Sequence, residues 1–268
     1  MNIFSLFVTG PLGAILGFIY NFTNSYGLAI IFFTIVIRIV LLPLSIKQQK
    51  SMVMQQKVQP LTAELQKKYK NDKEKLNQEM MKLYKEHKFN PAGGCLPLIV
   101  QMPIIFGLYR VIYRPLTHIL KMDQTAIKEL SESLQIAVHN EIAIASEAGL
   151  INLNFLGLNL GSSPTISMNP QELYGISLLW LIPILAAGTT YLSSYMTSKM
   201  SSSSGQNEKA AQMQSSMMKI FPLMTGVIAF SFPAGLGLYW IVSNMVQVLQ
   251  QFFLNKYYAP KKKEGKVA

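Results

Sequence analysis

The sequence predicts an all-α fold, that of a polytopic membrane protein with five transmembrane helices. Half of the 268 residues are apolar and only 14% are charged, a balance that is unusual for a soluble domain. The apolar residues also gather in runs that, as helices, approach the roughly 30 Å of a bilayer core. The remaining segments are predicted to form a cytosolic amphipathic helical hairpin and an outer interfacial N-terminal helix.

The N-terminal segment, residues 1–24, is the predicted interfacial helix. Its apolar residues recur at helical spacing, but Gly10 and Pro11 interrupt the run, and the part before them is too short to cross a bilayer. A sixth span is the alternative for residues 3–20. A removable signal peptide is not expected, because residues 1–20 lack a basic start and a small-residue cleavage site.

The first predicted span, residues 25–46, contains an arginine. Its apolar run, residues 27–45, reaches about 28 Å as a straight helix, which matches the hydrocarbon core. Arg38 would then lie about 16 Å from one end of the run and about 10 Å from the other. Because this placement costs at least about 2.5–3.5 kcal/mol, an ionisable group at such a depth indicates a functional site by default.

The segment that follows, residues 47–94, is the predicted hairpin. Two apolar stripes of helical period are separated by the polar residues 70–72, so each helix can bury its stripe against the other. The hairpin could bind a nascent chain or lipid headgroups, or it could be a solvated structural element, and both interpretations stay open. The stripes consist of Met54, Val58, Leu61, Leu65 and Tyr69, and of Leu76, Met80, Leu83 and His87.

The rest of the chain is predicted to contain four more spans. The fourth would reach only about 20 Å, which suggests a thinned bilayer or a re-entrant hairpin. A serine-rich stretch, residues 201–206, has the composition of a flexible linker. The predicted segments are a second span (95–113), an extracytoplasmic loop (114–174), a third span (175–196), a cytosolic loop (197–218), the fourth span (219–232), a fifth span (233–254) and a basic cytosolic tail (255–268).

The distribution of lysine predicts the orientation of the chain. Nineteen of the 21 lysines lie in the hairpin, near the serine-rich loop or in the tail, whereas only Lys121 and Lys128 lie in the other large loop. Because short basic loops stay in the cytosol, we expect the hairpin and the C-terminus inside a bacterial cell membrane and the N-terminus outside.

Arg38 has no acidic partner at its own depth, because the five predicted spans contain no aspartate or glutamate. We therefore expect it to face water, lipid phosphate or an acid supplied by a ligand, in a hydrated groove open to the cytosol. Two alternatives stay open: hydroxyl groups can bond to their own backbone, and Trp240 can be an interfacial anchor. The predicted groove residues are Arg38, Thr34, Gln101, Ser194, Trp240, Asn244 and Gln247.

Signatures of enzymes and metal sites are missing from the sequence. It contains no zinc-protease motif, no nucleophile elbow, no phosphate-binding loop and no pair of carboxylates within the spans. The single cysteine, Cys95, excludes an internal disulfide, and the three histidines are scattered. We expect no enzyme activity, no cofactor, no metal and no DNA partner.

Several long strings of this sequence resemble the YidC-type membrane protein insertases, whose relatives serve mitochondria and chloroplasts. They are GLAIIFFTIVIRIVLLPLSIKQQKS at 27–51, residues 59–104 and FPAGLGLYWIVSN at 232–244. The resemblance implies the five-span core of the Gram-positive form, without the large extracytoplasmic domain of Gram-negative members. It also implies that Arg38 lies in a hydrophilic groove that receives the polar, often acidic, tail of a substrate.

The function that the resemblance implies is insertion and assisted folding of nascent membrane proteins. An anion channel or transporter with Arg38 as its selectivity charge is the alternative, although no internal repeat is found, and a chaperone for assembling membrane complexes is a third hypothesis. The implied partners are nascent membrane proteins and the lipid bilayer, with a Sec-type channel and the ribosome as candidates for the hairpin and the basic tail.

Three departures from the family pattern stand out. Many Gram-positive members begin with a lipid-modified cysteine, which this chain lacks, so no lipid anchor is expected. The outer loop, residues 115–174, is longer than the resemblance leads us to expect. Ser193 and Ser194 stand near a position where some members have glutamine, which concerns the contribution of the third span to the groove.

Overall fold

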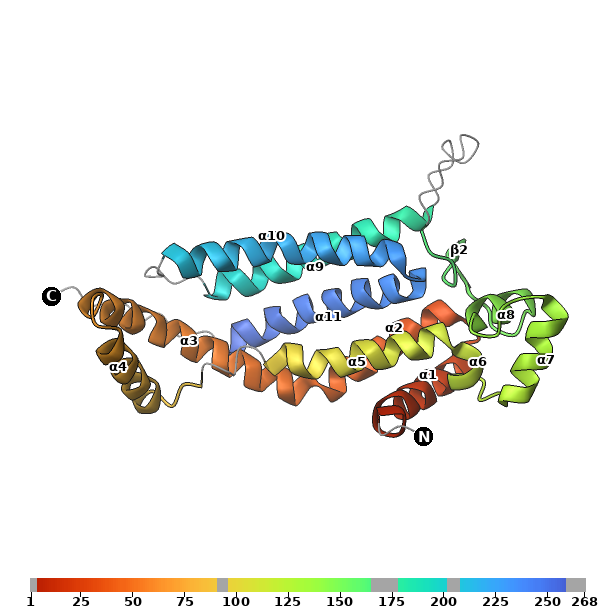
Figure 1. The fold of residues 1–268 in the computed structure, drawn as a ribbon, viewed down its shortest axis with the longest axis horizontal. Coiled ribbons are helices and arrows are strands. Elements are labelled where there is room, and N and C mark those ends of the chain that lie inside the picture. The colour runs from red at the N-terminus through yellow and green to blue at the C-terminus, as the bar shows by residue number, and fades with distance from the viewer. Residues whose placement is uncertain (1–3, 91–95, 165–177, 202–207, 259–268) are drawn as a thin grey trace.

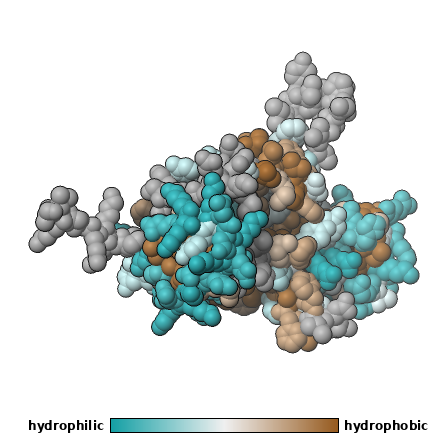
Figure 2. Space-filling model, turned by 60° about the vertical axis from the view of Figure 1, so that its left-hand side comes forward, coloured by the Kyte–Doolittle hydropathy of each residue, from teal (hydrophilic) through white to brown (hydrophobic). Residues whose placement is uncertain are grey.

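The computed structural model describes residues 4–90, 96–164, 178–201 and 208–258, and nearly all of them are helical. The molecule is elongated, with a helical hairpin at one end and a group of short helices at the other (Figure 1). Between these ends the long helices form layers in which the last helix, α11, packs against α2 and α5 on one side and α9 on the other. Hydrophilic residues gather over both ends and hydrophobic residues lie between them (Figure 2), as expected for a membrane protein.

The N-terminal segment is helical throughout its described part, which corrects the break expected at Gly10 and Pro11. A π-helical turn, η1 (Ser5–Thr9), continues directly into α1 (Gly10–Thr23). Proline is tolerated here because it lies in the first turn of α1, where its missing N–H would have no helical partner. Ser5–Thr23 forms 19 residues of helix, long and apolar enough to cross a membrane, so the length argument against a sixth span is wrong.

The predicted first span is not one straight helix. α2 (Tyr26–Val40) ends at Leu41, and α3 (Leu42–Lys68) leaves it at an angle of 58°. A proline in the first turn of α3 fits this position, since it begins a helix more readily than it continues one. Arg38 consequently lies in the last turn of α2 rather than in the middle of a long helix.

The hairpin consists of the outer part of α3 and of α4 (Lys73–Glu86), which pack against each other. The turn between them includes residues 70–72, where the apolar pattern is interrupted. Asp72 caps α4 by accepting a hydrogen bond from the backbone N–H of Lys75 at 2.9 Å. Val58 and Leu83, which come from the two predicted apolar stripes, are the buried apolar residues of α3 and α4.

Helix α5 (Leu96–Tyr113) leads into the predicted extracytoplasmic region, which we call the outer region and which is built from short elements. α6 (Pro115–His118), α7 (Gln124–Leu134) and α8 (Glu141–Glu147) are followed by an antiparallel pair of strands, β1 (Asn154–Phe155) and β2 (Leu158–Asn159). The loop after β2 accepts hydrogen bonds from the first residues of α11, so this region covers one end of the bundle. The remainder of the predicted extracytoplasmic loop, residues 165–177, lies outside the described residues.

The last three long helices extend beyond the predicted spans. α9 (Leu181–Ser201), preceded by the short helix η3 (Leu178–Trp180), and α10 (Glu208–Ser231) extend into the predicted cytosolic loop 197–218, which is therefore mostly helical. α10 has 24 residues, about 36 Å of helix, so the predicted fourth span is one part of a longer helix. The apolar part of this helix, Ile220–Ser231, is short, in line with the short fourth span expected from the sequence. α11 (Ala234–Tyr258) follows a tight turn, and most of the predicted linker 201–206 lies outside the described residues.

The number of membrane spans is not settled by length and composition. Within the described residues, two helices qualify alone, Ser5–Thr23 and Leu178–Ser198, and a third qualifies if α2 and the start of α3 count as one bent span. Val100–Tyr113 and Ile220–Ser231 are shorter apolar helices. The chain has several apolar helices, while the five-span count and the segment boundaries stay predictions.

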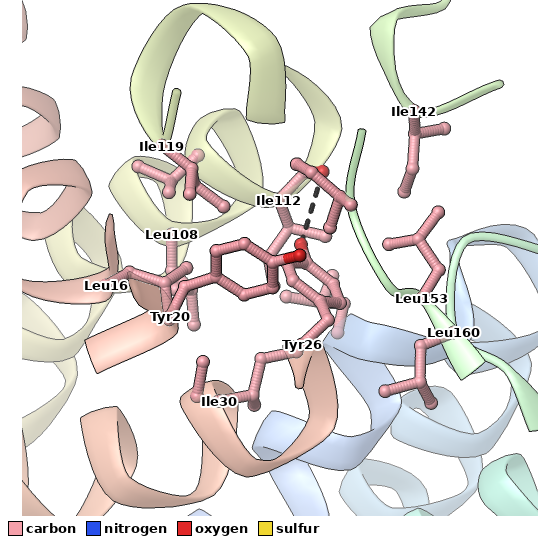
Figure 3. Packing of buried hydrophobic residues seen from close by; sticks show 14 of the residues in the cluster. Leu16, Tyr20, Tyr26, Ile30, Leu108, Ile112, Ile119, Ile142, Leu153 and Leu160 are labelled. Carbon is pink, nitrogen blue, oxygen red and sulfur yellow. Dashed lines mark hydrogen bonds between the residues drawn. The ribbon is translucent and has the colours of Figure 1, made fainter. Parts of the chain in front are cut away.

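A cluster of buried apolar side chains fills the end of the bundle next to the outer region (Figure 3). It joins α1, α2, α5 and the short helices, and its centre is Tyr26, whose hydroxyl donates to the backbone carbonyl of Ile112 at 3.5 Å. Phe155 lies directly over Gly27, where a Cβ atom would come within 2.2 Å of its ring. Glycine is therefore needed for β1 to pack on α2.

Candidate functional site

The side chain of Arg38 extends from the last turn of α2 toward the polar side of α11, the side that carries Ser243, Asn244, Gln247 and Gln251. Its Nε and Nη2 atoms donate to the hydroxyl of Ser243 at 3.1 and 2.6 Å, and Nη2 also donates to the amide oxygen of Gln247 at 3.1 Å. In return, the side-chain amide of Gln250 donates to the backbone carbonyl of Arg38 at 3.2 Å. Carbonyl groups in a last helical turn are open to such donors, so α11 holds both the side chain and the backbone of this residue.

The charge of Arg38 is not neutralised by any described residue. Both ion pairs in the described part of the chain lie elsewhere, between Lys82 and Glu79 in the hairpin and between Lys128 and Glu132 in α7. The acceptors around the guanidinium are a neutral hydroxyl and a neutral amide. These contacts orient Nε and Nη2, and among the described residues they leave Nη1 available to donate to an anionic group.

A second set of polar side chains extends from this point to α5. The side-chain amide of Gln101 donates to the hydroxyl of Tyr239 at 2.9 Å, and Tyr239 lies one helical turn before Ser243 on α11. A hydrogen bond therefore connects α5 to α11, next to the contact between Ser243 and Arg38. Tyr239 and Ser243 are nearly inaccessible, with 2% and 3% of their surface exposed, so this connection lies inside the bundle.

The other edge of the polar side of α11 contacts α9 and α3 instead of Arg38. Asn244 donates to the hydroxyls of Thr190 at 2.8 Å and Thr189 at 3.3 Å. Gln251 donates to Thr197 at 2.7 Å, and Gln49 donates to Asn255 at 2.7 Å. Hydrogen bonds of this kind hold helices together where there is little hydrophobic driving force between them.

The structure separates the predicted groove residues into two groups. Gln247 contacts Arg38 directly, and Gln101 bonds to Tyr239, one helical turn before the Ser243 that contacts Arg38. The others lie apart from the guanidinium contacts. Asn244 bonds to α9, Trp240 is partly buried against the apolar cluster, and Ser194 is half-buried on α9.

Thr34, a predicted groove residue, is buried and does not line a groove. It is 1% exposed, and its hydroxyl donates to the backbone carbonyl of Ile30, one turn earlier in the same helix, at 2.6 Å. This is the usual way in which a threonine satisfies its hydroxyl inside an apolar helix.

Two polar residues near Arg38, Ser243 and Tyr239, were missed by sequence reasoning. Ser243 lies four residues before Gln247, so helical spacing places both on one edge of α11. A search for every hydroxyl at this spacing would have found it. Nothing in the sequence singles out Tyr239, because aromatic residues are common throughout the spans.

Within the described part of the chain, neither a metal-ligating cluster nor either of two surface depressions lies at Arg38. No group of three or more metal-ligating side chains occurs among the described residues. One depression, of about 490 Å³, lies at the end of α4, another, of about 430 Å³, lies between α1 and α5, and neither includes Arg38. A hydrated groove around Arg38 therefore stays a prediction.

Comparison with known proteins identifies the family. Residues 18–262 match the family described as 60Kd inner membrane protein. Membrane protein insertase YidC from Clostridium perfringens is 35% identical over 259 residues, covering 92% of this chain and 85% of that protein. Its counterpart from Fusobacterium nucleatum is 34% identical over 247 residues, covering 90% and 93%.

Other relatives are much longer than this chain. YidC from Syntrophobacter fumaroxidans is 32% identical over 251 residues, but this chain spans only 38% of its length. A crystal structure described as active YidC insertase with the first transmembrane domain resolved aligns with a TM-score of 0.55 and 25% identity, covering 97% of this chain and 48% of the other. Taken with the match over residues 18–262, these relatives show that the chain belongs to the 60Kd inner membrane protein family, that of the YidC-type membrane protein insertases.

Proposed function

We propose that this chain is a membrane protein insertase in which Arg38 attracts the polar, acidic tail of a nascent substrate. The proposal depends on the contacts of the Arg38 guanidinium group. Ser243 and Gln247 orient it, no described acid neutralises it, and Nη1 has no partner among the described residues. A fixed positive charge with a free donor suits a transient carboxylate better than a permanent ion pair.

The polar residues supply a path of reduced cost for a short polar segment. The hydrogen bonds that these side chains make with one another can be replaced by hydrogen bonds to the tail of the substrate, so the tail keeps hydrogen-bond partners as it passes. The side chains are those of Gln101, Tyr239, Ser243 and Gln247. The substrate's own apolar helix supplies the driving force, at about 0.8 kcal/mol per CH₂ group transferred from water to lipid. Insertion by this route requires no nucleotide and no cofactor.

The proposed orientation assigns a side of the membrane to each end of the molecule. The α3–α4 hairpin and the lysine-rich C-terminal tail would face the cytosol, where the ribosome and a Sec-type channel are candidate partners. The α6–α8 region would face outward. In support, the two regions lie at opposite ends of the elongated molecule (Figure 1).

The experiment that tests this function is reconstitution of Arg38 variants in proteoliposomes with substrates that differ only in tail charge. Arg38→Ala should lower insertion of an acidic-tailed substrate by about tenfold or more, the effect of losing one charge-assisted hydrogen bond. Arg38→Lys should keep most of it, because the positive charge remains.

A substrate with a neutral tail is the matched control. Its insertion should fall much less in Arg38→Ala than that of the acidic-tailed substrate. Equal insertion of the acidic-tailed substrate by Arg38→Ala and the unmodified chain would refute the electrostatic role of Arg38.

A further inference from the structure

A second pair of arginines lies far from Arg38, at the other end of α5. The chain has three arginines in all, and the other two, Arg110 and Arg114, are one helical turn apart and exposed. The backbone N–H of Arg114 bonds to the carbonyl of Arg110 at 2.9 Å, which keeps them in helical register. In the orientation proposed above, this end of α5 faces outward, against the usual bias of basic residues toward the cytosol.

Neither arginine forms an ion pair with a described residue, that is, with any of residues 4–90, 96–164, 178–201 and 208–258. Glu141, an acid of the same region, is 3% exposed, and its two carboxylate oxygens accept hydrogen bonds from the backbone N–H and the hydroxyl of Thr117. Two exposed guanidinium groups one turn apart, with no ion-pair partner among the described residues, are suited to a phosphate.

The aromatic residues around them mark the level of a membrane interface. Tyr109 and Tyr113 pack with their ring centres 5.3 Å apart, and Tyr109 also contacts Phe232 at 5.2 Å. The guanidinium of Arg110 lies over the ring of Phe4 at 5.4 Å, a cation–π contact that orients its side chain. Tyrosine is enriched at the level of lipid headgroups, so the two arginines lie where phosphates are found.

An apolar depression of about 430 Å³ lies in the seam between η1, α1 and α5, on the side of Arg110 that leads toward the start of α5. The seam is narrow because Gly107 lets η1 approach closely: a Cβ atom there would lie 2.6 Å from a methyl group of Val8. From Arg110 to Val100 α5 extends about 15 Å, half of a bilayer core, which is the depth of one leaflet. The depression is lined by Phe7, Val8, Pro11, Leu12, Val100, Pro103 and Ile104.

We propose that this seam binds one anionic phospholipid of the outer leaflet, with its phosphate between Arg110 and Arg114 and an acyl chain in the apolar depression. Charge selects the headgroup, and the 70% exposed ring of Phe7 gives the chain an apolar wall. The lipid would attach η1 and α1 to α5. The proposal rests on the orientation of the proposed function, but it requires nothing of Arg38.

Native mass spectrometry of the delipidated chain, incubated with equal amounts of phosphatidylglycerol and phosphatidylcholine, tests the site. The unmodified chain should retain phosphatidylglycerol preferentially, and Arg110→Gln with Arg114→Gln should lower its retention by about tenfold. Lys121→Gln with Lys128→Gln, which removes two other charges from the same outer region, should retain it as the unmodified chain does. Phe7→Ser should weaken retention while the arginines remain.

Two results would overturn the site. The first is equal retention of phosphatidylglycerol and phosphatidylcholine by the unmodified chain. The second is an equal loss of phosphatidylglycerol in the arginine and the lysine double variants, which would mean that the lipid is attracted by the overall positive charge. A thermal unfolding profile of each variant shows that it is folded. Arg38→Ala serves as the reference for function. Arg38→Ala should lose insertion but bind the lipid normally. The double variant of Arg110 and Arg114 should lose lipid binding, and this loss would not bear on the role of Arg38 in insertion.

Discussion

The two halves of the helical bundle are filled in opposite ways. In the half next to the outer region, which we call the apolar half, the facing side chains of α2, α5 and α11 are fully buried and almost all apolar, among them Tyr26, Ile30, Phe33, Leu108 and Leu236. In the polar half, from the last turn of α2 to the end of α11, the same helices meet through hydrogen bonds. The side chains that make them are those of Arg38, Gln49, Ser243, Gln247, Gln250 and Asn255.

This difference in side-chain contacts indicates that the two halves of the bundle have different roles. Close apolar packing is costly to open, because every separated side chain loses its contacts. Hydrogen bonds to neutral hydroxyl and amide groups can be exchanged for equivalent bonds to a guest at little net change in free energy. The apolar half thus holds the bundle closed, and the polar half can admit a polar chain.

Removing a large side chain from the apolar half should have the largest effect on stability. Phe33 is 0% exposed, and Phe33→Ala should lower the free energy of unfolding by about 3 kcal/mol through the cavity that it leaves. The adjacent Phe32 is 48% exposed, so Phe32→Ala is a matched control that should change little. Unfolding in detergent measures both. Similar losses for the two variants would mean that this half is not the packed core.

Removing the two residues that orient Arg38 should have an intermediate effect, and on function rather than on folding. Ser243→Ala with Gln247→Leu leaves the charge in place but takes away its described side-chain partners. Insertion of an acidic-tailed substrate should fall several-fold, less than the about tenfold expected for Arg38→Ala. Met245→Ala, at a position 54% exposed on the same helix, should insert normally. A double variant that equals the unmodified chain would show that these contacts do not position the charge.

Breaking the contact between α11 and α9 should have a smaller effect. Asn244→Leu removes the hydrogen bonds to Thr190 and Thr189 and should cost about 0.6 kcal/mol of stability, the average for such bonds between membrane helices. Insertion should be nearly unchanged, since Asn244 does not touch Arg38. Thr190→Val removes the same bond from the other helix and should give a similar loss of stability. A large loss of insertion without loss of stability would instead place Asn244 among the substrate-binding residues.

The smallest effect is expected from His118 in the outer region. Its burial lowers the pKa of His118 below the usual value, and Arg114 and Arg110 lower it further, whereas Glu141 from α8 opposes the shift. The folded state thus favours the neutral ring. The resulting stabilisation is complete above the ordinary histidine pKa of about 6.5 and is lost as the pH falls through that value toward the lowered pKa.

The unfolding temperature should accordingly decrease slightly between about pH 7.5 and about pH 5, around the ordinary histidine pKa. His118→Asn should flatten this dependence, and the exposed His139→Asn should keep it. A slope that survives His118→Asn would assign the effect to another group.

The sequence predicted the helical class and grouped Arg38 with Gln247, which it contacts, but it did not predict the break beside Arg38. Residues 27–45 form an unbroken apolar run, and a proline such as Pro43 is compatible with a kink or with the start of a new helix. The 58° bend depends on how α3 packs against α11 through Gln49 and Asn255, which are far apart in the chain. Contacts of this range leave no periodic signal in the sequence.

The polar side of α11 shows the same limit. Trp240, Asn244, Gln247 and Gln251 are spaced four, three and four residues apart, so they share one side of α11. The spacing of these residues in the sequence does not show which neighbouring helix each of them contacts. In the structure Gln247 turns to α2, whereas Asn244 and Gln251 turn to α9.

The most direct test of the account is photocrosslinking to the tail of a stalled nascent membrane protein. A crosslinker at Gln101 or Gln247, in the polar half, should react with the acidic tail of the substrate, and the yield should fall when Arg38 is alanine. A crosslinker at Leu28, which is 38% exposed in the apolar half, should not react with the tail. Equal yields from Leu28 and Gln247, or no crosslink from Gln247, would contradict entry of the substrate through the polar half.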